Sequence, residues 1–109
     1  MQLLPEEVKK QIPALYSQEN ESDPFVICKF FDPTSSWTWY VIEGEEKERS
    51  VGTDFLFFGF VVGGDAELGY FTLQQLLSAK KNMTGIQAVP IERDAHFTPC
   101  RLSDIKKYY

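Results

Sequence analysis

The sequence lacks the residue patterns on which most catalytic and metal sites depend. It contains 2 cysteines and 1 histidine in 109 residues, and their spacing matches no metal-binding motif. No serine stands in a Gly-x-Ser-x-Gly elbow, and the pair Gly63-Gly64 is not followed by the Lys-Ser/Thr of a phosphate-binding loop. These motifs therefore give no support to nucleophilic catalysis, to a metal centre or to nucleotide binding, and we expect no cofactor.

Basic charge is scarce as well. The chain has 11 Lys and Arg against 16 Asp and Glu, which gives a net charge of −5. The acids gather in residues 1–54, with 11 acids and 5 bases, whereas residues 55–109 hold 5 acids and 6 bases. Because binding to a phosphate backbone needs a positive surface, this composition argues against a nucleic-acid partner. The excess is also too small for an acidic mimic of DNA.

Long apolar runs are missing from the N-terminus, MQLLPEEVKK, which is charged instead. This stretch predicts neither a signal peptide nor a membrane span. Two cysteines are a poor disulfide framework, and Cys28 lies in an apolar stretch where it is interpreted as a small buried hydrophobe. We therefore expect a cytoplasmic protein without a membrane partner.

The chain is rich in apolar and aromatic residues. Hydrophobic residues make up 43% of it, including 9 Phe, 5 Tyr and 2 Trp, which is enough to build a core. A length of 109 residues predicts a single domain over residues 1–109.

The clearest local pattern is the stretch 54–77, DFLFFGFVVGGDAELGYFTLQQLL. It predicts a strand over 55–62, a tight turn in which Gly63-Gly64-Asp65 supplies positive φ values, and a returning strand over 66–71. Thr72 then caps a helix and Gln75 completes a capping box. Strand 55–62 is apolar on both faces, so either helices or a partner must cover it.

Shorter signals predict the remaining elements. Pro5 and the acids after it indicate a helix over 5–12. Two more strands are expected over 25–31 and 36–43, with a turn at 32–35 between them and a charged loop over 44–52 after them. Towards the C-terminus we expect a strand over 87–91, an extended piece over 92–98 and a helix capped by Ser103.

These elements together predict an α+β fold. The sheet is expected to be a single antiparallel meander of about four to five strands, with two or three short helices packed on it.

Three strings, in this order, resemble the bacterial family called domain of unknown function 2958: KFFDPTSSWTWY, LFFGFVVGGDAELGYFTL and PIERDAHFTP. The opening, MQLLPEEVKKQIPALYSQ, is similar to the usual start of that family. The resemblance covers almost the whole chain and is weakest over 43–54. It implies a compact bacterial protein, often carried on a plasmid or another mobile element. It implies no established reaction, so no catalytic residue follows from it.

Two groups of residues are candidates for binding. Trp37 and Trp39 share one face of their strand, where they form either a stacking platform for a ligand or a part of the core. Glu67 and Tyr70 flank Gly69 in the returning strand, where a ligand could approach closely or the glycine could mark a bulge.

The segment Glu92-Arg93-Asp94 with His96 is the best candidate for chemistry. In an extended chain Glu92, Asp94 and His96 would share one face, with Arg93 on the other. Such a set can serve acid–base or metal-assisted hydrolysis, with Glu67 as a further carboxylate, or it can be a solvated edge or an ion-pair network.

The absence of catalytic motifs and the aromatic content favour a non-catalytic protein that binds another macromolecule. We expect a protein partner contacted by Trp37, Trp39, Glu67, Tyr70 and Arg93, and a monomer or weak homodimer. The alternative is a small metal-assisted hydrolase or nuclease that uses Glu92, Asp94 and His96.

Overall fold

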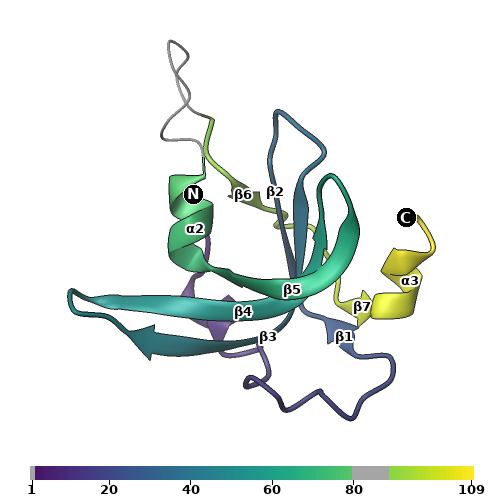
Figure 1. The fold of residues 1–109 in the computed structure, drawn as a ribbon, viewed down its shortest axis with the longest axis horizontal. Helices are drawn as coiled ribbons and strands as arrows, with labels where there is room; N and C mark the ends of the chain where they lie inside the picture. The colour runs from purple at the N-terminus through teal and green to yellow at the C-terminus, as the bar shows by residue number, and fades with distance from the viewer. Residues whose placement is uncertain (1, 80–88) are drawn as a thin grey trace.

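A five-stranded antiparallel sheet forms the centre of the molecule (Figure 1). The structure is a computed structural model that describes residues 2–79 and 89–109. The strands lie in the order β5-β4-β3-β2-β6, with these bounds: β2 Cys28–Phe31, β3 Thr38–Glu48, β4 Thr53–Val62, β5 Ala66–Thr72 and β6 Glu92–Arg93. Strands β2 to β5 are neighbours in chain order, which confirms the predicted meander, and β6 pairs with the other side of β2. The predicted α+β class is confirmed.

A second, two-stranded sheet joins β1 (Phe25–Val26) to β7 (Cys100–Arg101). The predicted strand over 25–31 is therefore divided at Ile27, whose N–H donates to the carbonyl of Val41 at 2.8 Å. The local sequence holds no signal for this division, because the partner of β1 comes from the far end of the chain.

The described part of the chain also forms three short helices: α1 Glu6–Lys9, α2 Leu73–Ser78 and α3 Leu102–Lys106. The predicted capping box of α2 is confirmed, since Gln75 N–H donates to Thr72 Oγ1 at 3.1 Å and Thr72 N–H donates to Gln75 Oε1 at 2.8 Å. Helix α1 is shorter than the predicted span 5–12, and Pro5 lies at its N-cap. Among the described residues, no helix has the length and apolar character needed to cross a membrane.

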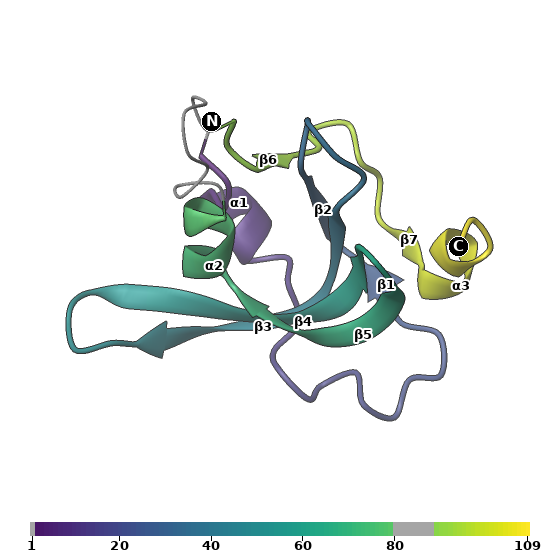
Figure 2. The ribbon, with the colours of Figure 1, turned by 45° about the horizontal axis from the view of Figure 1, so that its top comes forward.

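The two faces of β4 lie in two separate cores, as its two-sided apolar sequence predicts. On one face the fully buried ring of Phe57 packs edge-on against Phe30, 5.5 Å between centroids, and stacks on Phe71 at 5.1 Å. Helices α1 and α2 lie over this face, which we call the α1/α2 face (Figure 2). On the other face Phe60 packs with buried side chains of α3, and we call it the α3 face.

Strands β3 and β4 form a long hairpin that projects from the rest of the sheet (Figure 1). The predicted charged loop over 44–52 is wrong in its first half, because residues 44–48 continue β3 and pair with residues 53–57 of β4. Residues 45–48 of β3 are exposed and charged, so their sequence resembles that of a loop. The pairing register shifts between Val41 and Glu43, which marks a β-bulge.

The turn between β4 and β5 differs from the predicted positive-φ hairpin. Of the described glycines, only Gly52 has φ in the left-handed region, so the prediction for Gly63 and Gly64 is wrong. Packing explains the first of these two glycines instead, because a Cβ on Gly63 would collide with the ring of Trp37.

Candidate functional site

The residues predicted to bind a partner lie on different faces of the sheet. Trp37 and Trp39 stack with ring centroids 5.9 Å apart, and Trp39 packs against the core of the α1/α2 face. Trp37 is 45% exposed, so the pair is neither wholly buried nor an open platform. Tyr70 packs instead on Phe58 of the α3 face, with centroids 5.0 Å apart. The fold therefore separates Tyr70 from the two tryptophans.

Glu92, Asp94 and His96 do not form the predicted row along an extended segment. Strand β6 ends at Arg93, and the chain then turns, with the Asp94 carboxylate accepting the backbone N–H of His96 at 2.9 Å. The predicted extended piece over 92–98 is thus wrong beyond β6. Within residues 2–79 and 89–109, no group of three or more His, Cys, Asp and Glu side chains is placed to hold a metal ion. One pocket of about 380 Å³ is nevertheless lined by Glu92, Asp94 and His96, together with Lys29, Phe31 and Arg93. The hydrolase alternative therefore stays a prediction.

Arg93 lies on β6 and Glu67 on β5, at opposite edges of the five-stranded sheet. Arg93 is half-buried on β6, where it pairs with Phe30 of β2. Burial raises the pKa of the neighbouring Cys28 thiol to about 12, and the positive charge of Arg93 opposes this shift. Cys28 is therefore buried, as the sequence predicts, and its raised pKa makes the thiol poorly reactive. Glu67 is exposed near the start of β5.

A groove of about 430 Å³ lies on the α3 face, lined by the segment 16–24, strand β5 and helix α3. We call it the β5 groove. Buried or half-buried apolar side chains form its floor: Ile42, Phe58 and Leu102. Tyr16, Leu68 and Tyr70 also line it. These residues are 61%, 46% and 53% exposed, respectively. Large side chains this exposed and this close together are typical of a contact surface.

The bulge in β3 places Glu43 beneath the groove. Glu43 is buried, with only 4% exposed, and its two carboxylate oxygens accept the backbone N–H groups of Tyr16 at 2.9 Å and of Gln18 at 2.7 Å. Tyr16 has a φ of 68°, the one left-handed value at a non-glycine among the described residues. A buried carboxylate that accepts two backbone hydrogen bonds is well compensated. Glu43 therefore holds this wall of the β5 groove in place.

The β5 groove carries more negative than positive charge. Its charged lining consists of three acids and one base: Glu19, Glu21, Glu43 and Lys106. The pKa of the Tyr70 phenol is raised, first by partial loss of contact with water, then by the charge of Tyr16 and a side-chain hydrogen bond with it, and then by the carboxylates of Glu43 and Glu19. The carboxylates of Glu43 and Glu19 thus disfavour a further negative charge at this phenol.

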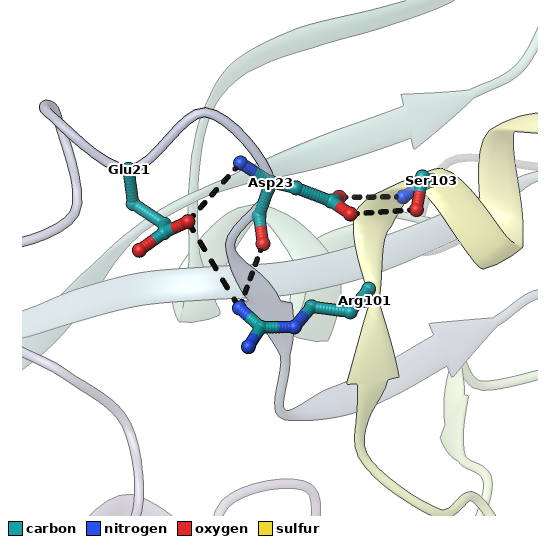
Figure 3. Close-up of polar contacts among 4 residues, drawn as sticks. All are labelled: Glu21, Asp23, Arg101 and Ser103. Carbon is teal, nitrogen blue, oxygen red and sulfur yellow. Dashed lines mark hydrogen bonds and ion pairs between the residues drawn. The ribbon is translucent and has the colours of Figure 1, made fainter.

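A polar clasp joins two walls of the groove (Figure 3). The Asp23 carboxylate accepts the backbone N–H of Ser103 at 2.9 Å and its hydroxyl at 2.7 Å. Arg101 Nη1 donates to the Asp23 carbonyl at 3.0 Å and lies 4.0 Å from a carboxylate oxygen of Glu21. The prediction that Ser103 caps α3 is wrong, because the N-cap residue is Arg101 and the capping carboxylate comes from Asp23, far away in the sequence.

Reasoning from the sequence identified Tyr70 but missed the residues that build the groove around it. Glu43 had one local signal, an acid directly after the apolar run of its strand. Tyr16 and Asp23 had none, since both lie in a polar segment that reads as an ordinary loop. Their roles depend on partners in β3 and α3.

Comparison with known proteins supports the resemblance seen in the sequence. The profile of the family described as "Protein of unknown function (DUF2958)" matches residues 3–108, nearly the whole chain. No curated protein and no solved structure matches the chain. Because the match extends over both cores and the β5 groove, the chain belongs to the DUF2958 family.

Proposed function

We propose that this protein is a non-catalytic binding protein whose docking site for another protein is the β5 groove. One observation carries the proposal: Leu68 and Tyr70 stand half-exposed beside Tyr16 over an apolar floor. Aromatic side chains over apolar floors supply most of the affinity in protein interfaces. The groove is also braced by Glu43 and by the Asp23 clasp, so a partner meets a surface that is already ordered.

The charge of the site supports a protein partner over a nucleic acid. Three of the four charged residues that line the β5 groove are acids, and the whole chain carries −5. A phosphate backbone would be repelled by such a surface. The tryptophan pair supports docking less well, because Trp39 packs against the core of the α1/α2 face.

The cellular setting is part of the same proposal. We place the protein in the bacterial cytoplasm, encoded on a plasmid or another mobile element, because the family resemblance implies that origin. The partner is then a protein of the host or of the element. We expect the free protein to be a monomer or a weak homodimer.

Site-specific photo-crosslinking in the native host tests the proposal. A photo-reactive amino acid replaces Leu68 in one variant and Val51, 82% exposed in the hairpin turn, in a matched control. We expect position 68 to capture one defined protein and position 51 to capture none. The captured protein is then purified and its affinity for the intact chain is measured.

A pair of tyrosine variants completes the test with that purified protein. Tyr70→Ala should weaken the complex about tenfold or more, because it removes a central aromatic contact. Tyr108→Ala, exposed and outside the groove, should change the affinity less than twofold. Equal affinities of the two variants, or capture from position 51 in place of position 68, would show that the groove is not the docking site.

A further inference from the structure

We propose that the partner binds as an extended segment along the outer edge of β5, and that this segment places a lysine or arginine side chain in the β5 groove beside Tyr16, Tyr70 and Glu19. This inference rests on the proposed function and specifies the chemistry of the partner.

The edge of β5 has the length and the composition that strand addition needs. β5 is an outermost strand of the sheet and pairs, among the described residues, with β4 alone over seven residues. It contains no lysine or proline, the residues that commonly protect exposed edges. The opposite edge strand, β6, has only two residues, both charged. An extended peptide therefore finds a row of backbone groups at β5 and little at β6.

Gly69 adds a second feature to this edge. It does not have a left-handed φ, and a Cβ built on it meets no atom within 4 Å. Neither the backbone conformation nor the internal packing therefore requires a glycine at position 69. A strand glycine without an internal role is typical of places where another backbone approaches closely.

Strand alternation fixes where the partner's side chains go. Leu68 and Tyr70 both line the β5 groove, so that face of β5 continues into it. Every second side chain of an added strand points to the same face and enters the groove.

The lining of the groove fits a cation at that point. Tyr16 and Tyr70 offer two phenol rings, and a cation over such a face is attracted by the ring's quadrupole. No described side chain forms a hydrogen bond or ion pair with the carboxylate of Glu19, which lies near enough to Tyr70 to raise the pKa of that phenol. Among the described residues, Lys106 is the one basic residue that lines the groove. Its Nζ lies 5.7 Å from the ring centroid of Phe60, and no ion pair joins it to Glu19. Charge complementarity thus favours lysine or arginine over an acidic or neutral side chain.

Peptide titration of the ¹⁵N-labelled full chain tests this inference directly. The probe is an octapeptide of alternating lysine and threonine, and the control is the same peptide with glutamate in place of lysine. We expect saturable shifts of amide signals in residues 66–72 and 16–24 with the lysine peptide only. N-methylation of alternate peptide nitrogens should weaken binding about tenfold or more, because it removes the hydrogen bonds of an added strand.

A charge variant probes the cation site without disturbing the fold. Glu19→Gln should weaken the lysine peptide about two- to fivefold, as expected for a partly exposed ion pair. Glu48→Gln, an exposed acid on the projecting hairpin, should leave the affinity unchanged. Equal binding of the lysine and glutamate peptides, or no effect of N-methylation, would overturn the inference.

The result separates this inference from the proposed function. Capture of a protein at position 68 without any shift from the lysine peptide would leave the docking site standing and refute the cationic strand. Concentration-dependent shifts of the β5 amides in the absence of peptide would identify a second copy of the chain as the occupant, and would also refute it.

Discussion

Gly59 of β4 and Gly69 of β5 lie directly opposite each other in the sheet, yet only Gly59 is held to glycine by its neighbours. A Cβ on Gly59 would collide with the backbone carbonyl of Tyr40 in β3, whereas a Cβ on Gly69 meets open space. The two residues share a position in the pairing and differ in what lies beside them. Strand β4 is enclosed between β3 and β5, and β5 is at the edge.

This difference predicts opposite effects of the same substitution. Gly59→Ala should lower the free energy of unfolding by about 1–3 kcal/mol or more, because backbone atoms of β3 must move. Gly69→Ala should raise it by about 0.4–1 kcal/mol, since alanine restricts the unfolded chain without strain in the folded one. Urea unfolding of both variants measures these changes. A destabilised Gly69→Ala would show that this position has an internal role.

Glu43 should be far more important to stability than its position at a bulge suggests. Glu43→Ala leaves the backbone N–H groups of Tyr16 and Gln18 without their acceptor, which we expect to cost about 2–4 kcal/mol. Glu48→Ala, on the exposed part of the same strand, should change the stability by less than about 0.5 kcal/mol. Chemical denaturation compares the two. Similar stabilities would contradict the role given to the Glu43 carboxylate.

The clasp between Asp23 and Ser103 predicts a pH dependence. Hydrogen bonds from the Ser103 hydroxyl and N–H lower the pKa of Asp23 below its ordinary 3.8. A carboxyl whose pKa is lowered by folding contributes stability above the unfolded pKa and loses it as the pH falls through the folded value. The melting temperature of the native chain should therefore exceed that of Asp23→Asn at pH 6, and the difference should shrink below about pH 4. A constant difference down to pH 2 would argue against an ionised clasp.

The two thiols should react at very different rates. Burial raises the pKa of Cys28 from 9.0 to about 12, which reduces its thiolate fraction near pH 8 about a thousandfold. Cys100 is only half-buried, and burial followed by the charge of Asp104 raises its pKa. Ellman's reagent should modify one thiol per native chain and the second only after unfolding. Cys100→Ser should abolish the faster reaction, and its persistence would show that Cys28 is accessible.

Local patterns predicted the elements whose partners are near in the sequence. Residues close in the sequence form the hairpin of β4 and β5 and the capping box of Thr72 and Gln75. The sequence alone therefore predicts both. The cap of α3 was not visible, because Asp23 reaches Ser103 from the other half of the chain. The extension of β3 was also hidden, since its exposed charges on a projecting hairpin resemble those of a loop.

By itself the sequence determined the α+β class, the meander and the two-sided burial of β4, because short-range periodicity and turn chemistry decide these features. Only the tertiary structure decided which residues form the β5 groove. It brought Tyr16, Glu43 and Tyr70 to one groove and moved the tryptophans to the other face. Such a meeting depends on a bulge and on contacts between distant segments, whose free energies no local pattern encodes.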